Sequence, residues 1–370
     1  MGTPLRMEGA SAPLVRAAIV GTGNIARFHI EALTSMPDQV EVVAAADVDE
    51  ENLTRFGSRH GLDALYRDVE EMLSATSPDL VHVCTPPGLH RSQVLACLEA
   101  GASALVEKPP ALSLAELEAM AAAEGARGPW FATLFQHRFG SGAQRARALI
   151  ESGDLGRPLV AVCHTTWYRE QSYFDVPWRG RWETEGGGPT MGHGIHQMDL
   201  LAALLGDWAE VSASAHQQAR TIQTEDVSLA RVTFANGAVA SVVNSLVSPR
   251  EESYIRIDLE RATIELTHLY GYGDEDWRIT PAPGFEEQVT AAWKAGEAGV
   301  ASGHTAQLGH VIAAVQGGTA PPVTSAESLR TMRLVAGVYA SAFQRRPITP
   351  ADLGADSPFH GRMDGDGPRW

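Results

Sequence analysis

The sequence predicts an α/β protein of two domains, the first built on a parallel sheet and the second on a large, mostly antiparallel open sheet. Short apolar runs alternate with helical patterns over the first third of the chain, which is typical of parallel βαβ units. A glycine-rich turn, Gly21-x-Gly23-x-x-Ala26, follows the first apolar run. Further along, alternating apolar and polar runs flank Asn236-Gly237, a pair that favours a hairpin turn.

Composition excludes several classes of protein. At 370 residues the chain is too long for one ordinary core, and 44% hydrophobic with 20% charged residues is typical of a globular protein. The formal net charge of −16, with no basic stripe to offset it, argues against a nucleic-acid partner. No apolar run reaches the roughly 18 residues of a membrane span, and the N-terminal residues lack a secretion-signal pattern, so no membrane partner is expected. Cys84, Cys97 and Cys163 are scattered as in a reducing cytosol, so we expect a cytoplasmic protein.

The first expected strand covers residues 14–20 and runs into the glycine turn, with a helix expected over 25–35. Gly21 permits the sharp bend, Gly23 lets the backbone approach a pyrophosphate, and the helix start offers free N–H groups to phosphates. An ordinary βα turn is the alternative for this motif taken alone. In its context the turn predicts a Rossmann domain whose dinucleotide contacts come from Gly21, Thr22, Gly23, Asn24 and Ile25.

Asp47 follows the second expected strand, over residues 40–46. An acid at this strand end can accept hydrogen bonds from the adenosine ribose hydroxyls, whereas it would repel a 2′-phosphate. Asp47 therefore predicts NAD as the cofactor, with NADP less favoured. The alternative is that Asp47 caps the helix expected over 51–60.

Two further strands continue the parallel sheet, and residues 130–136 are expected to form another strand after the helix over 113–124. Residues 80–84 form the third and end at a proline-rich loop, Thr85 to His90; residues 104–106 form the fourth and end at Glu107-Lys108-Pro109. The carboxyl ends of parallel strands meet at one edge, where ligands of such sheets bind. We therefore expect these side chains to lie beside the cofactor: Thr85, Pro86, His90, Glu107 and Lys108.

The order of the glycine turn, Asp47, Thr85-Pro86 and Glu107-Lys108-Pro109 resembles the Gfo/Idh/MocA family, the relatives of glucose–fructose oxidoreductase and inositol dehydrogenase. The resemblance implies an NAD(P)-dependent oxidoreductase that transfers hydride to or from a secondary alcohol or ketone of a sugar, cyclitol or related polyol. It also implies that Lys108 lies beside the nicotinamide and helps bind or protonate the substrate. A surface Glu-Lys pair is the alternative.

A second chemical centre is expected between Trp178-Arg179-Gly180 and Asp199, where three successive glycines precede Gly-Ile-His-x-x-Asp. The imidazole of His196 can exchange a proton near neutral pH, and Asp199 lies three residues on along the same helix face. This run also resembles the family, in which the His is the usual proton-transfer residue and the Asp a substrate or orienting group. Many relatives carry an acid four residues before the His, where this chain has Gly192.

The residues of this second centre could also have other roles. His193 could substitute for the missing acid or hold a substrate hydroxyl, and Arg179 is a further candidate substrate contact. His196 could instead be structural. A metal site on His193, His196 and Asp199 is conceivable, but three ligands on one helix converge poorly, so no metal is expected.

We expect a Rossmann domain over 14–135, a substrate-binding and oligomerisation α+β domain over 136–349, and a tail over 350–370. The second domain should contain the strands 227–234, 238–247, 254–259 and 262–269 and a closing helix over 325–345. We expect helices to cover one face of its sheet and a partner subunit to cover the other. A homo-oligomer, either a dimer or a tetramer, is therefore expected.

Two other functions remain possible. One is an NAD-dependent glycosidase that oxidises and re-reduces a sugar to break a glycosidic bond. The other is a non-catalytic dinucleotide-sensing regulator, which the presence of both Lys108 and His196 disfavours.

Overall fold

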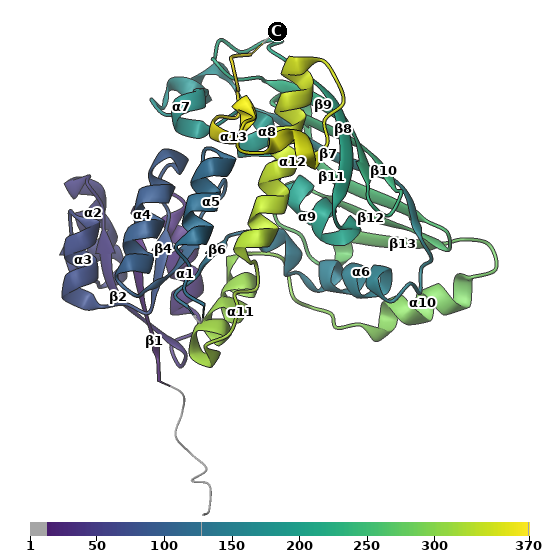
Figure 1. Cartoon of the computed structure of the whole chain (residues 1–370). Coiled ribbons are helices and arrows are strands. Elements are labelled where there is room, and N and C mark those ends of the chain that lie inside the picture. The colour runs from purple at the N-terminus through teal and green to yellow at the C-terminus, as the bar shows by residue number, and fades with distance from the viewer. Residues whose placement is uncertain (1–12, 127, 369) are drawn as a thin grey trace, which may run out of the picture.

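A computed structural model describes residues 13–126, 128–368 and 370, and it contains two separate sheets (Figure 1). The first sheet is parallel throughout and has the strand order β3-β2-β1-β4-β5-β6. Its strands are β1 (Val15–Val20), β2 (Val40–Ala46), β3 (Leu65–Tyr66), β4 (Leu80–Val83), β5 (Ser103–Val106) and β6 (Phe131–Thr133). This order is that of the Rossmann fold, so the predicted fold of the first half is confirmed.

Helices alternate with these strands and cover both faces of the sheet. They are α1 (Ala26–Thr34), α2 (Glu50–His60), α3 (Val69–Thr76), α4 (Pro87–Glu99) and α5 (Leu114–Ala122). The expected loop from Thr85 to His90 is wrong from Pro87 onward, because α4 already begins there. Proline suits the first position of a helix, where its missing N–H would have no partner anyway.

The second sheet has seven strands in the order β13-β12-β11-β7-β10-β9-β8, and only β7 and β10 pair in parallel. Its strands are β7 (Pro158–Tyr168), β8 (Trp208–His216), β9 (Val227–Phe234), β10 (Val239–Ser245), β11 (Val247–Leu259), β12 (Ala262–His268) and β13 (Trp277–Pro281). Gly237, with φ of +90°, turns the chain between β9 and β10 as predicted. The edge strands β8 and β13 were not predicted.

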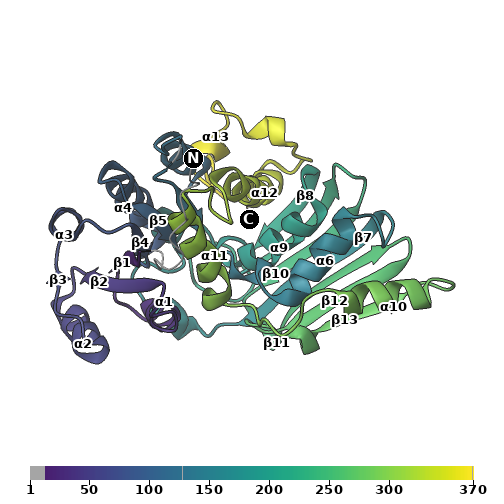
Figure 2. The same cartoon turned by 90° about the horizontal axis from the view of Figure 1, so that it is seen from below.

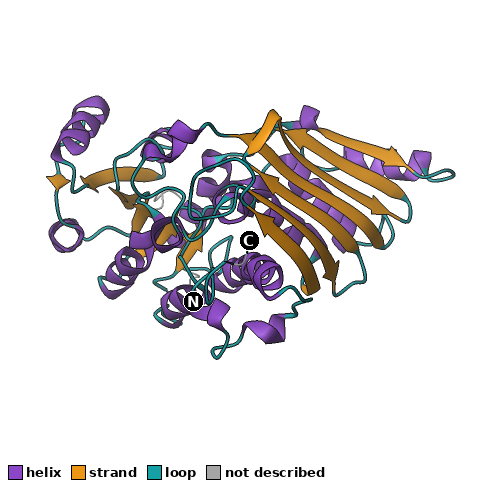
Figure 3. Ribbon diagram, turned by 90° about the horizontal axis from the view of Figure 1, so that it is seen from above, coloured by secondary structure: helices purple, strands orange, loops and turns teal. Residues whose placement is uncertain are grey.

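Helices lie across one face of this second sheet, as Figures 2 and 3 show. They are α6 (Ser141–Glu151), α9 (Ile195–Leu205), α10 (Glu286–Ala295) and α12 (Ser325–Gln344). In the described part of the chain the opposite face carries no helix, and Val160, Leu229 and Val239 are exposed there. The α+β class predicted for the second half is confirmed.

The last helices connect the two halves. α11 (His304–Gly317) packs on α1 and places Leu308, Val311 and Ile312 in the same apolar core as Ile30 and Leu33. α12 runs between the sheets (Figure 1) and begins at Ser325 as predicted, with Thr324 as its capping residue in a capping box with Glu327.

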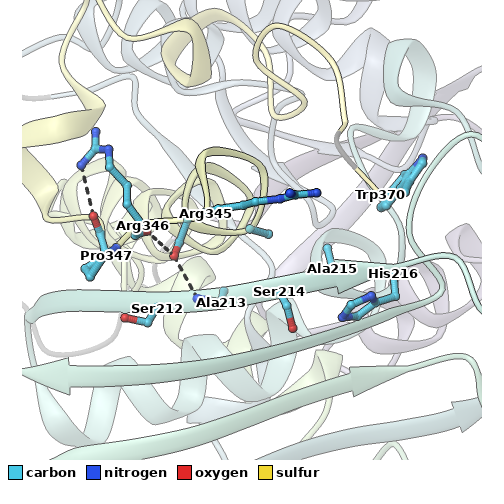
Figure 4. Close-up of a pocket in the computed structure, with 11 residues that line it drawn as sticks. Ser212, Ala213, Ser214, Ala215, His216, Arg345, Arg346, Pro347 and Trp370 are labelled. Atoms are coloured by element: carbon cyan, nitrogen blue, oxygen red, sulfur yellow. Dashed lines mark hydrogen bonds between the residues drawn. The ribbon is translucent and has the colours of Figure 1, made fainter.

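The C-terminal residues fold back onto the body. A turn of 3-10 helix (Pro350–Leu353) and α13 (Pro358–Gly361) follow α12, and Phe359 is buried. Trp370 lies over a cavity of about 440 Å³ between β8 and the end of α12 (Figure 4). Among the described residues, no helix combines the length and apolar character that crossing a membrane requires.

Candidate active site

A cavity of about 530 Å³ opens at the carboxyl edge of the parallel sheet, where the two halves of the chain face each other. One wall comes from the first sheet and includes Gly23, Thr85, Pro86, Glu107 and Lys108. The opposite wall comes from the segment between β7 and α9 and includes Trp167, Tyr173, Arg179, Glu185 and His193. The predicted crevice and most of the predicted site residues therefore meet in one place.

The glycine turn is shaped for a phosphate group. Gly21 has φ of +84°, and a Cβ there would lie 2.8 Å from the Cγ2 of Thr85, so only glycine fits where the turn crosses the end of β4. A Cβ on Gly23 would meet no atom within 4 Å, which leaves its backbone open to the cavity. No side chain caps the start of α1, and among the described residues the backbone N–H groups of Gly23, Asn24 and Ile25 just before it donate no hydrogen bond, so they are open to a ligand. These features fit the pyrophosphate of a dinucleotide, held by the backbone from Gly21 to Ile25.

Asp47 is held in place by the same turn. One carboxylate oxygen accepts hydrogen bonds from the backbone N and the Oγ1 of Thr22, at 2.7 and 2.8 Å, and the other accepts from the N of Asp49. The helix-cap alternative for Asp47 is wrong, because Asp49 caps α2 by accepting from Glu51 and Asn52.

His90 is buried in α4 and is not part of the cavity wall. Its Nδ1 lies 2.9 Å from the carbonyl oxygen of Pro109 and its Nε2 lies 2.8 Å from that of Thr85. Burial lowers the pKa of His90, although both carbonyl contacts favour the charged ring. His90 thus ties together two loops of the cofactor wall, Thr85-Pro86 and Lys108-Pro109.

Glu107 lies in a buried histidine cluster beneath the cavity. Its Oε1 lies 3.0 Å from the Nε2 of His29 and 3.4 Å from the Nε2 of His304, and the Nδ1 atoms of His29 and His82 are 2.8 Å apart. Burial favours the neutral carboxyl, but the hydrogen bond to His29 and the nearby ring of His304 outweigh it and hold the pKa of Glu107 well below its usual range. The ligand atoms of His29, Glu107 and His304 lie within 4.8 Å of one another. The 3.0 Å contact between Glu107 and His29 is a hydrogen-bond distance, whereas the Nε2 of His304 makes no hydrogen bond among the described residues.

Lys108 bridges the two walls. Its Nζ donates a hydrogen bond of 3.2 Å to the carbonyl oxygen of Gly192, which precedes His193. Burial lowers the pKa of Lys108, Glu107 and Glu185 raise it, and Arg179 lowers it further. A lowered pKa increases the fraction of neutral amine that can take a proton from a hydroxyl group.

Of the two histidines in the glycine-rich run, His193 lines the cavity and His196 does not. His193, between α8 (Pro189–Gly192) and α9, lines the cavity with its Nε2 3.3 Å from the hydroxyl of Tyr173. His196 lies behind that wall and stacks on His137 with ring centres 4.8 Å apart. Neither ring nitrogen of His196 has a hydrogen-bond partner among the described residues. Burial, assisted by Lys108, lowers the pKa of both imidazoles well below the usual value, so both are neutral at pH 7.

Asp199 is buried away from the cavity. Its two carboxylate oxygens accept hydrogen bonds of 2.7 and 2.6 Å from Arg138, and one also accepts from the Oγ1 of Thr331 at 2.8 Å. Burial raises the pKa of Asp199 although Arg138 opposes the shift. The ion pair joins α9 to the 3-10 helix after β6 (Gln136–Arg138), and the bond from Thr331 joins α9 to α12.

The outer cavity wall is aromatic and cationic. The guanidinium of Arg179 lies 4.0 Å from the ring centre of Tyr173 and 4.5 Å from that of Trp178, and it also bonds to the Tyr173 hydroxyl. The structure thus places Arg179 at the cavity as predicted.

Glu185, which the sequence reasoning missed, ends α7 (Trp182–Glu185) and lines the same cavity. Burial raises its pKa to about 7. Its position directly before the three glycines was the available signal.

Known proteins share this architecture over nearly the whole chain. Residues 15–133 match the oxidoreductase family with an NAD-binding Rossmann fold, and residues 143–265 match the GFO/IDH/MocA C-terminal domain. The chain belongs to the Gfo/Idh/MocA oxidoreductase family. The resemblance stated from the sequence is confirmed, and the protein is an NAD-binding oxidoreductase.

Two relatives are named as dehydrogenases of a sugar and of a glucoside. D-apiose dehydrogenase of Paraburkholderia graminis is 28% identical over 93% of this chain and 92% of its own length. D-glucoside 3-dehydrogenase of Escherichia coli is 30% identical over 70% of this chain and 79% of its own length. Among solved structures, the WlbA dehydrogenase of Bordetella pertussis in complex with NADH and UDP-GlcNAcA is 26% identical, with a TM-score of 0.81 over 92% of this chain and 99% of that one.

Proposed function

We propose that this oxidoreductase transfers hydride between NAD and a secondary alcohol or ketone of a sugar, cyclitol or related polyol. The observation that carries the proposal is that Lys108, with its lowered pKa, lies in one cavity with the open glycine turn and an aromatic wall. The sugar dehydrogenases among the relatives support the same substrate class.

We assign the cofactor to the side of the cavity formed by the first sheet. The backbone from Gly21 to Ile25 would hold the pyrophosphate, and Asp47, already fixed by Thr22, would accept the ribose hydroxyls. Its carboxylate favours NAD over NADP because a 2′-phosphate would lie against a negative charge. When bound, the nicotinamide supplies the hydride acceptor or donor.

We assign proton transfer to Lys108. As hydride leaves the carbon of an alcohol, the hydroxyl proton passes to the neutral amine of Lys108, and ketone reduction runs in the opposite sense. His193 is placed to hold the reacting or a neighbouring hydroxyl, since it lines the cavity and His196 does not. The proton-transfer role that the family resemblance gives His196 stays a prediction. Arg179 is retained as a substrate contact on the aromatic wall formed with Tyr173 and Trp178.

Cofactor titration followed by a panel of sugars and polyols tests this function. We expect NADH to form from NAD with at least one secondary alcohol of the panel, followed by the absorbance of the reduced nicotinamide. Release of a free sugar from a glycoside with no net NADH would support the NAD-dependent glycosidase instead. Tight NADH binding with turnover of no compound would support the sensing regulator.

The open face of the second sheet supports a homo-oligomer, dimer or tetramer. Val160 and Val239 are neighbours in the β7–β10 ladder, and with Leu229 they leave apolar side chains exposed. Exposed apolar patches of this kind commonly mark protein interfaces. Light scattering of the full chain should give a mass of two or four subunits. The buried free cysteines Cys84, Cys97 and Cys163 support a reducing, cytoplasmic location.

A further inference from the structure

Glu185 has one carboxylate oxygen engaged and one free. Its Oε2 accepts a hydrogen bond of 2.5 Å from the backbone N of Gly180, which fixes the side chain in the cavity wall. Its Oε1 lies 3.9 Å from the guanidinium of Arg179, too far for a hydrogen bond. No described residue donates a hydrogen bond to Oε1, so this oxygen is left to a ligand.

Gly192 provides the space for this oxygen. A Cβ built on Gly192 would meet a single neighbour within 4 Å, the Oε1 of Glu185, at 3.6 Å. The carbonyl of Gly192 meanwhile accepts the hydrogen bond from the Nζ of Lys108. The free oxygen of Glu185 and the amine of Lys108 thus lie near the same glycine, one at the position that a Cβ would occupy and one at its carbonyl.

The charges that face Glu185 come from three other elements. Arg179 and Lys108 stabilise its carboxylate form, and Glu225, which accepts from the backbone N of Gly188 and of Thr190, destabilises it. A free carboxylate oxygen in such a wall is a hydrogen-bond acceptor that a sugar hydroxyl can satisfy.

We propose that the Oε1 of Glu185 binds a hydroxyl group of the substrate beside Lys108, in the space that the missing side chain of Gly192 leaves open. Glu185 then selects substrates that carry a hydroxyl next to the reacting carbon, because an analogue without it gives the Oε1 that faces the cavity no hydrogen-bond donor. This inference rests on the proposed polyol activity for its substrate.

The first test compares the wild type with Glu185→Gln on a substrate found in the panel. The amide oxygen of Gln can still accept from Gly180, so the local fold is retained while the charge is lost. We expect kcat/KM to fall about 10- to 100-fold, the usual range for a hydrogen bond to a charged group. The deoxy analogue should lose much less, so the preference for the hydroxyl compound shrinks. A value within about twofold of the wild type for both compounds would overturn the proposal.

The second test moves the carboxylate from residue 185 to the neighbouring residue 192. In Glu185→Gln/Gly192→Asp the new carboxyl starts from a Cβ position that has no close neighbour except residue 185. We expect this double variant to recover at least about tenfold in kcat/KM over Glu185→Gln. Glu185→Gln/Gly192→Ala is the matched control, because it adds bulk without charge and should recover nothing. Equal recovery by both double variants would contradict a role for the carboxylate.

A third measurement needs no substrate. The lysines of the chain are Lys108 and Lys294, so ¹³C-methylated protein gives one lysine signal from the site and one from the surface helix α10. Glu185 raises the pKa of Lys108, so Glu185→Gln should shift the Lys108 titration to lower pH and leave Lys294 unchanged. An unshifted Lys108 would overturn the placement of Glu185 beside it. If the wild type turns over no compound while this shift appears, the polyol function fails and the geometry of Glu185 stands.

Discussion

The two walls of the cavity differ in how they are built. The cofactor wall consists of strand ends and the turns that follow them, so Gly23, Thr85 and Lys108 reach the cavity because their strands stop at one sheet edge. The substrate wall comes from residues 167–193, where short helical turns and loops replace regular elements. The first wall is fixed by a repeating pattern along the chain. The substrate wall is fixed by contacts such as the hydrogen bond between Gly180 and Glu185, which no local sequence pattern predicts.

Lys108→Ala gives the largest expected effect, because it removes the residue that joins the walls. Loss of a positioned proton-transfer group lowers kcat by about 10²- to 10⁴-fold. NAD affinity should change little, since the pyrophosphate and ribose contacts come from the glycine turn and Asp47. Steady-state kinetics and NADH fluorescence titration separate the two quantities. A parallel loss of NAD affinity and turnover would show that Lys108 serves the cofactor wall alone.

The difference between the walls explains what the sequence could predict. The Rossmann order of strands and the positions of Gly21, Asp47 and Lys108 follow from periodicity and strand ends. The Asn236-Gly237 hairpin was equally readable, because its turn chemistry is local. The division of the chain at 135/136 stays a prediction; α11, far along the chain, joins the core of the first half.

Asp199→Ala removes a buried ion pair behind the cavity, so we expect it to lower the stability of the fold. Removing the carboxylate leaves Arg138 buried, with Glu327 as its remaining ion-pair partner. The free energy of unfolding should fall by about 3 kcal/mol, measured by urea denaturation at pH 7. Glu151→Ala, which breaks the exposed pair with Arg147, should cost less than about 0.5 kcal/mol. Unchanged stability together with a raised KM would instead support the predicted substrate contact for Asp199.

Asp199 and His90 show a limit of sequence reading. His90 was predicted at the site from its place after a strand end, and Asp199 from its helical spacing to His196 and the family resemblance. Position along the chain does not reveal which way a side chain points once other elements pack on it. Asp199 meets Arg138 and Thr331 from distant segments, and His90 meets the carbonyl of Pro109. Glu185 was missed although it directly precedes the three glycines, because its approach to Gly192 exists only in the folded chain.

His193 and His196 provide a comparison within the substrate wall. His193→Ala should lower kcat/KM about 10- to 100-fold, because it removes a group that lines the cavity. His196→Phe keeps a ring against His137 and should lower it by less than about tenfold. Steady-state kinetics on one substrate measure both. The reverse order of effects would restore His196 as the proton-transfer residue that the family resemblance implies.

Asp47→Ala tests the far end of the cofactor wall and should give the smallest change. Removal of the carboxylate takes away the acceptor for the ribose hydroxyls and the charge that opposes a 2′-phosphate, so the ratio of NAD to NADP affinity should fall about tenfold. Fluorescence titration with NADH and NADPH measures the ratio. Asp49→Ala is the matched control: it removes the cap of α2, which should cost about 1 kcal/mol of stability and leave the ratio unchanged. If both variants keep the wild-type ratio, NAD selection does not lie at Asp47, and the basic side chains near the glycine turn, Arg27, Arg55 and Arg59, become the place to look for it.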